Sequence, residues 1–81
     1  MVIPENIYYR YESNIDGGTA YIFDVISGDV LKTSKSVYGI LKSIDKRESM
    51  DEIISKYSAD YSKEEIMGCI EELKNLKILS N

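Results

Sequence analysis

The hydrophobic pattern of this chain changes its period near residue 34, and this change limits its possible folds more than any other feature. Before that residue, short runs of tyrosine, valine, isoleucine and phenylalanine are separated by turns that contain glycine, as in antiparallel strands. After it, apolar residues recur every three or four positions, as on one face of a helix. Strands first and helices afterwards predict an α+β fold.

Two tight turns join the expected strands. Asp16-Gly17-Gly18 can take the positive φ angles that a hairpin requires, and Ser27-Gly28-Asp29 forms the second turn. The sequence therefore predicts a three-stranded antiparallel meander with strands at about 7–13, 19–26 and 29–33.

Three helices are expected after the meander, at about 35–45, 50–58 and 63–76. The second and third open with capping boxes, in which Ser49 precedes Glu52 and Ser62 precedes Glu65 by three residues. The side chains expected to face the core are Val37, Ile40, Leu41, Ile44, Met50, Ile53, Ile54, Tyr57, Ile66, Ile70, Leu73, Leu76, Ile78 and Leu79. We therefore predict one domain that spans residues 1–81.

Length and composition favour a binding module over an enzyme. A chain of 81 residues builds one core and has little room for an enclosed catalytic pocket. It has no histidine, and Cys69 is its one cysteine. The commonest general base and any Cys/His metal site are therefore missing. We expect no catalytic residue, no metal and no cofactor.

The start of the chain and its apolar runs bear on its location. Residues 1–6 lack the basic and apolar regions of a signal peptide, and no run approaches the roughly 20 apolar residues of a membrane span. The single cysteine cannot form an internal disulfide. We therefore expect a cytoplasmic protein with no membrane partner.

The net charge of −4 is distributed unevenly along the chain. The basic side chains Lys42, Lys46 and Arg47 crowd the end of the first expected helix. There they either complement the helix dipole or form a docking patch for an acidic partner. Residues 61–81 carry four glutamates against three lysines, which is unfavourable for a helix that reads nucleic acid.

Three single residues stand out from their surroundings. Asp24, in an apolar run, either lines the exposed face of the sheet or accepts a hydrogen bond from the adjacent turn. Gly68 costs about 1 kcal/mol inside a helix relative to alanine, so either a neighbouring backbone or a ligand packs closely there. Cys69 has no histidine to activate it, and we interpret it as a half-buried packing residue.

The strand expected at 29–33 offers the clearest binding signal. It is short and a helix follows at once, so one of its sides can be left with unpaired N–H and C=O groups. Such an edge is a template for an added strand. Lys32 on this strand either protects the edge from aggregation or contacts an acidic residue of a bound peptide.

Several segments together resemble the PqqD-like family, the RiPP recognition elements that bind precursors of ribosomally made natural products. The longest is residues 23–41, FDVISGDVLKTSKSVYGIL, which has a Gly-x-Val turn, a short strand and a helix with a small residue before Ile-Leu. Residues 49–54, SMDEII, and 71–79, EELKNLKIL, resemble later parts of the family pattern. The similarity runs from about residue 7 to 79 and implies a winged helix-turn-helix fold.

The resemblance implies that a leader peptide pairs with the third strand as an extra antiparallel strand, beside the third helix. It further implies that a modifying enzyme, in cis or in trans, such as one of the radical-SAM class, acts on the tethered precursor. Proline at Leu31 is then expected to abolish binding. The peptide-binding residues predicted in this way are Asp29, Val30, Leu31, Lys32, Thr33, Met67, Ile70, Glu71, Leu73 and Lys74.

Other functions remain open at this point. A winged-helix DNA-binding regulator shares the implied fold, and a different protein–protein adaptor, such as a scaffold or a subunit of an unrelated enzyme, is a second alternative. The acidic third helix weighs against the DNA-binding regulator, and salt-dependent binding to duplex DNA would identify it. We expect no nucleic-acid partner.

Overall fold

Three strands form one antiparallel sheet in the order β1-β2-β3, and β3 lies at its edge. The computed structural model describes residues 1–81, with β1 at Ile7–Glu12, β2 at Thr19–Asp24 and β3 at Val30–Thr33. Each strand is shorter than predicted, most of all β2. Its end is set by Asp24, which accepts hydrogen bonds from the backbone N–H groups of Ile26 (3.0 Å) and Ser27 (3.3 Å). These bonds turn the chain two residues earlier than predicted.

Three helices follow the sheet, as the sequence predicts. They are α1 (Lys35–Asp45), α2 (Met50–Tyr57) and α3 (Lys63–Asn75). The Ser34 hydroxyl caps α1 by accepting from the Val37 N–H at 3.3 Å. Both predicted capping boxes are present, at Ser49 and Ser62. These caps place the three helix starts where the sequence predicts them, and α2 and α3 end one residue early.

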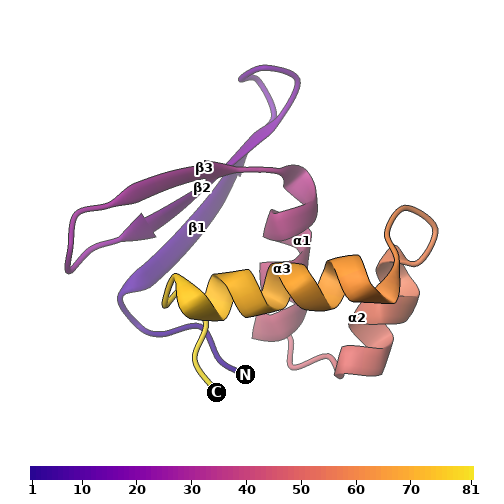
Figure 1. Cartoon of the computed structure of the whole chain (residues 1–81). Helices are drawn as coiled ribbons and strands as arrows, with labels where there is room; N and C mark the ends of the chain where they lie inside the picture. The colour runs from indigo at the N-terminus through magenta and orange to yellow at the C-terminus, as the bar shows by residue number, and fades with distance from the viewer.

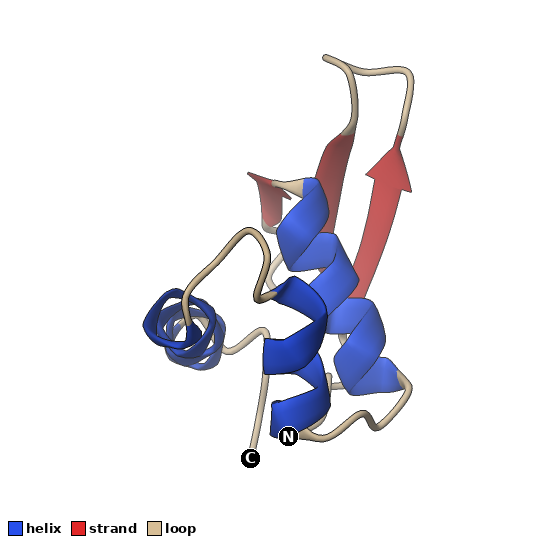
Figure 2. Ribbon diagram, turned by 90° about the vertical axis from the view of Figure 1, so that its right-hand side faces the viewer, coloured by secondary structure: helices blue, strands red, loops and turns tan.

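The helices cover one face of the sheet and leave the other face open (Figures 1 and 2). α1 packs across β1 and β2, and α3 lies below β3 on the same side (Figure 1). The Tyr9 hydroxyl of β1 donates a hydrogen bond to Asp45 at the end of α1. Eleven buried side chains form the core between these layers: Ile7, Ile22, Ile40, Leu41, Ile44, Ile53, Ile66, Ile70, Leu73, Ile78 and Leu79.

Most side chains predicted to face the core do so, with one clear exception. Ile78 and Leu79 turn back onto the core as predicted, with exposed fractions of 5 % and 3 %. Leu76 was predicted to be buried and is 53 % exposed. The reason is that α3 ends at Asn75, and Lys77 then takes a positive φ of 62° that reverses the chain. Four further side chains are only partly buried against the core: Val37, Met50, Ile54 and Tyr57.

The two ends of the chain lie close together beneath the sheet (Figure 1). Val2 and Ser80 form an isolated antiparallel bridge, with two backbone hydrogen bonds of 2.9 Å. The basic cluster predicted at the end of α1 includes Lys42, whose Nζ lies 5.8 Å from the centroid of the Tyr38 ring. None of the three helices has the length and apolar character needed to cross a membrane.

Candidate functional site

The outer edge of β3 carries main-chain groups without partners. The N–H of Asp24 donates to the carbonyl of Asp29 at 2.9 Å, just before β3 begins. Because antiparallel pairs alternate, Leu31 is then hydrogen-bonded to β2, and Val30 and Lys32 turn their N–H and C=O groups away from it. No hydrogen bond outside the β2–β3 ladder involves these four groups of Val30 and Lys32. Two donors and two acceptors therefore face outward.

The side chains of β3 leave this edge accessible. Val30 is 60 % exposed and Leu31 is 41 % exposed, although both are apolar. The Nζ of Lys32 lies 3.2 Å from a carboxylate oxygen of Asp16, and both side chains are mostly exposed. Such a pair contributes at most about 1 kcal/mol. Lys32 is thus already paired within the chain, and the edge is not covered by any other segment.

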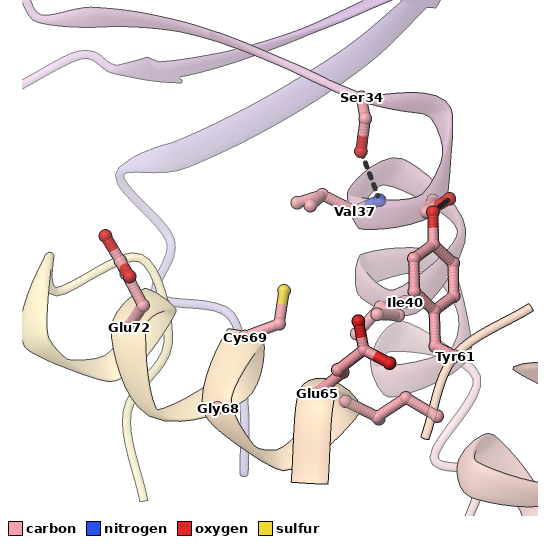
Figure 3. A pocket seen from close by; sticks show the side chains of 10 residues that line it. Ser34, Val37, Ile40, Tyr61, Glu65, Gly68, Cys69 and Glu72 are labelled. Atoms are coloured by element: carbon pink, nitrogen blue, oxygen red, sulfur yellow. Dashed lines mark hydrogen bonds between the residues drawn. The ribbon is translucent and has the colours of Figure 1, made fainter. Parts of the chain in front are cut away.

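A groove of about 350 Å³ lies between the start of α1 and the middle of α3, next to the end of β3 (Figure 3). Its apolar walls come from Val37 and Ile40 of α1 and from Ile66 of α3. The Tyr61 hydroxyl closes one end, 2.9 Å from the hydroxyl of Ser36. We call this the first groove. The other residues that line it are Ser34, Glu65, Gly68, Cys69 and Glu72.

A second groove of about 260 Å³ lies at the opposite end of β3, against the C-terminal end of α3. Leu76, which was predicted to be buried, forms one wall of this groove, and its side chain is exposed there. The remaining lining residues are mostly apolar: Ile7, Ile22, Asp24, Asp29, Val30, Leu31 and Ile78. The two grooves therefore flank β3, one at each end; α3 itself lines the first, and the residues just past its C-terminal end line the second.

The face of α3 that lines the grooves differs from the predicted one. It comprises Glu65, Ile66, Gly68, Cys69 and Glu72, and the C-cap residue Leu76 continues the same helical spacing just past the end of α3. None of the five residues predicted on this helix lines either groove. Helical periodicity separates faces of a helix but does not say which exposed face turns toward the sheet. The five are Met67, which is 43 % exposed, Ile70 and Leu73, which are in the core, and Glu71 and Lys74, which pair at 3.6 Å.

Unlike the residues predicted on α3, most of those predicted on the strand lie at the candidate site. Asp29, Val30 and Leu31 line the second groove, and Lys32 lies on the exposed edge. Thr33 is half-buried and pairs with Ala20 of β2. The structure therefore brings the strand residues together along one edge, opposite a face of α3 that the sequence did not indicate.

Gly68 faces open space in the first groove. A Cβ built on this residue meets no atom within 4 Å, so the alternative of a closely packed neighbouring backbone is wrong. Its neighbour Cys69 is half-buried in the same groove (Figure 3). Burial raises the pKa of the Cys69 thiol, and the negative charge of Glu72 raises it further. The thiol is therefore a weak nucleophile.

Carboxylates are the only charged groups that line the two grooves. Glu65 and Glu72 line the first groove, and Asp24 and Asp29 line the second, without any lysine or arginine. Asp24 accepts a hydrogen bond from the Asn6 amide at 3.0 Å and two more from the turn that follows, and the latter is one of the two alternatives that the sequence left open. These bonds, that of Asn6 first, lower the pKa of Asp24 and keep it ionised. The surface between β3 and α3 is therefore acidic.

No group of three or more His, Cys, Asp or Glu side chains gathers closely enough to hold a metal ion. Comparisons with protein-family models, curated proteins and solved structures gave no match. The open edge of β3 and the two grooves beside it together form the candidate site.

Proposed function

We propose that this domain binds the leader peptide of a RiPP precursor by β-strand addition to β3. The observation that carries the proposal is the set of outward N–H and C=O groups of Val30 and Lys32. An extended peptide satisfies such groups with main-chain hydrogen bonds, which give affinity for almost any sequence. An edge left open at the cost of an aggregation risk is more readily explained by a guest strand than by structural need.

The two grooves give a strand at this edge a means of selection. Side chains of a bound strand point alternately to its two faces, and those on the helix side meet the space between β3 and α3. Both grooves have apolar walls and open to the surface. A contact of this size buries at most about 1,200 Å², so we expect affinity in the micromolar to high-nanomolar range.

In this proposal the domain is a winged helix-turn-helix module of the cytoplasm that has no catalytic role of its own. It holds the leader and raises the effective concentration of the attached core segment at a modifying enzyme, in cis or in trans. The sequence resemblance to PqqD-like proteins supports the choice of a leader peptide and of a modifying enzyme such as one of the radical-SAM class. DNA binding is disfavoured because Glu65 and Glu72, on the exposed side of α3, would face the phosphates.

The experiment uses proline at two neighbouring positions of β3. Lys32→Pro removes an outward N–H, which an edge strand tolerates, and Lys32→Ala is its matched control. Leu31→Pro, which the sequence suggested, instead removes a bond to β2 and weakens the sheet itself. The probes are synthetic peptides that cover the short open reading frames flanking the gene, and binding is measured by fluorescence anisotropy.

We expect at least one peptide to bind, with a dissociation constant unchanged by Lys32→Ala and raised at least about tenfold by Lys32→Pro. Amide exchange measured by NMR provides a second readout, in which bound peptide slows exchange at Val30 and Lys32. Circular dichroism verifies that the proline variant is folded. Equal binding by both Lys32 variants, or no protection at Val30, refutes strand addition at this edge.

A further inference from the structure

We infer, on the basis of the proposed function, that the guest strand carries two apolar side chains four residues apart with a lysine or arginine midway between them. The apolar side chains enter the two grooves that flank β3. The cationic side chain lies over the Glu72 carboxylate. This assigns a substrate class to the site, namely peptides with an apolar-x-basic-x-apolar segment.

The spacing follows from the positions of the grooves along β3. Val30 lines the second groove, and Ser34, four residues later, lines the first. A strand rises about 3.3 Å per residue, so the groove positions are roughly 13 Å apart along a paired strand. Side chains four residues apart in a strand point to the same face. Two anchors at this spacing can therefore enter both grooves together, whereas a spacing of three places one of them on the wrong face.

The charge follows from the side chains that line the cleft. Four carboxylates and no cation border the two grooves. Glu65 is already used, because its Oε1 accepts from the Ser62 N–H at 2.9 Å. Asp24 is used by Asn6 and the turn. The carboxylates of Glu72 and Asp29 make no hydrogen bond or ion pair within the chain, and of these two residues only Glu72 lies on α3.

Glu72 lies at the correct place for the midpoint of the guest. It is on α3 between Gly68, in the first groove, and Leu76, in the second. Figure 3 shows its side chain on the same side of α3 as Cys69, at the end of the groove away from Tyr61. A cation placed there is attracted by the unpaired Glu72 carboxylate. The same carboxylate would repel a glutamate or aspartate of the guest.

Two other occupants fit these charges less well. An acidic peptide would have to use Lys32, whose Nζ is already 3.2 Å from Asp16. A second copy of the chain, paired edge to edge through β3, would bring two acidic clefts and two net charges of −4 together. Like charges at such a contact are destabilising. A basic and apolar strand has neither difficulty.

The test uses three fluorescein-labelled peptides of twelve residues that differ only in the centre. The first contains Leu-Thr-Lys-Thr-Leu, the second Leu-Thr-Glu-Thr-Leu, and the third has its two leucines three residues apart around lysine. Serine and threonine fill the flanks of all three. Binding is measured by anisotropy at low and high salt, with the full chain.

The matched variants are Glu72→Lys and Glu71→Lys. Both make the same change at adjacent positions of α3, but Glu71 lines neither groove and pairs with Lys74 at 3.6 Å. We expect the lysine peptide to bind about threefold to tenfold more tightly than the glutamate peptide, and the difference to shrink at high salt. Glu72→Lys is expected to reverse this preference, whereas Glu71→Lys preserves it. Of the two peptides that carry lysine, the one with the shorter leucine spacing is expected to bind the unmodified chain more weakly.

Different failures separate the two proposals. If the glutamate peptide binds as well as the lysine peptide and still protects Val30 and Lys32 from amide exchange, the inferred guest chemistry is wrong and strand addition stands. Equal effects of Glu71→Lys and Glu72→Lys also overturn the inference, because the charge would then act without regard to position. If none of the three peptides binds, the inferred class is refuted. If the peptides from the flanking open reading frames do not bind either, the proposed function is refuted as well.

Discussion

Replacing Gly68 by alanine should make this protein more stable. The residue lies inside α3, where glycine costs about 1 kcal/mol relative to alanine. A Cβ at this position meets no atom within 4 Å, so no clash offsets the gain. We therefore expect Gly68→Ala to raise the free energy of unfolding by about 0.8–1 kcal/mol. For a domain of this size, that corresponds to a rise in Tm of about 4–8 °C.

The same position should show a conflict between stability and binding. Gly68→Leu retains most of the gain in helix propensity, but its side chain projects into the first groove. We expect this variant to be more stable than the unmodified chain in urea unfolding, and to bind the Leu-Thr-Lys-Thr-Leu peptide at least about tenfold more weakly. Gly68→Ala adds a single methyl group, so its affinity for this peptide should lie between those of the unmodified chain and Gly68→Leu.

Gly28→Ala is the matched control for the sign of the effect. This glycine also has open space around it, but its φ is +82°, a conformation that costs an L-residue roughly 1–2 kcal/mol. The same chemical change should therefore destabilise the protein at Gly28 and stabilise it at Gly68. A loss of stability in Gly68→Ala would refute the reasoning about free space. Undiminished peptide binding by Gly68→Leu would show that the first groove is not used.

Three further predictions concern single residues. Lys77→Gly should stabilise the protein by about 0.5–1 kcal/mol in urea unfolding, because Lys77, in the turn that follows α3, has a positive φ of 62°. Unchanged stability would contradict this. Cys69 should react with iodoacetamide at pH 8 more slowly than a short reference peptide that contains cysteine, because burial raises the pKa of its thiol. A guest peptide bound in the groove should slow the reaction further. A rate equal to that of the reference peptide would show that the thiol is fully accessible. The lowered pKa of Asp24 means that the folded state favours its ionised form, so this stabilisation is present above about pH 4 and lost as the pH falls below it. Asp24→Asn should therefore lower Tm at pH 7 and reduce the dependence of Tm on pH between about 2 and 4, as measured by thermal unfolding across that range.

The order of elements could be predicted from the sequence because local signals agree with the fold. Ser49 and Ser62 mark two helix starts through capping boxes, and both boxes are present. The exposed edge strand was also predictable, since a short final strand followed by a helix has no later strand to cover it. These features depend on residues close together in the chain.

The groove-lining face of α3 could not be predicted, because it depends on how the helix is rolled against the sheet. Met67 and Cys69 are both outside the fully buried stripe of this helix, and periodicity treats them alike. Packing distinguishes them, because Cys69 contacts the core and lines the first groove whereas Met67 does neither. The glycine at position 68 was the available signal. A helix-breaking residue with no turn to form indicates the face where something else must fit.

The exposed position of Leu76 had a different cause. The apolar spacing continues past the end of α3, but the backbone leaves the helix when the N–H of Ile78 bonds to the carbonyl of Leu73 and Lys77 takes a positive φ. Lysine is an unusual residue at such a position, where glycine is the common signal. A prediction from apolar spacing alone therefore extends the buried stripe of the helix by one residue too many.

Three local departures from stability meet at one surface of this molecule. Glycine occupies the middle of α3 with free space beside it, the main-chain groups of Val30 and Lys32 have no partners, and four carboxylates border the grooves without a cation. Each departure alone has several explanations. Sequences usually agree with their fold at every level, and the exceptions concentrate where function requires them. A domain of 81 residues has a small margin of stability, so it can retain few such departures. Their coincidence between β3 and α3 is what a site for a basic, extended guest segment requires, because such a guest supplies the missing hydrogen bonds, fills the free space and neutralises the charge.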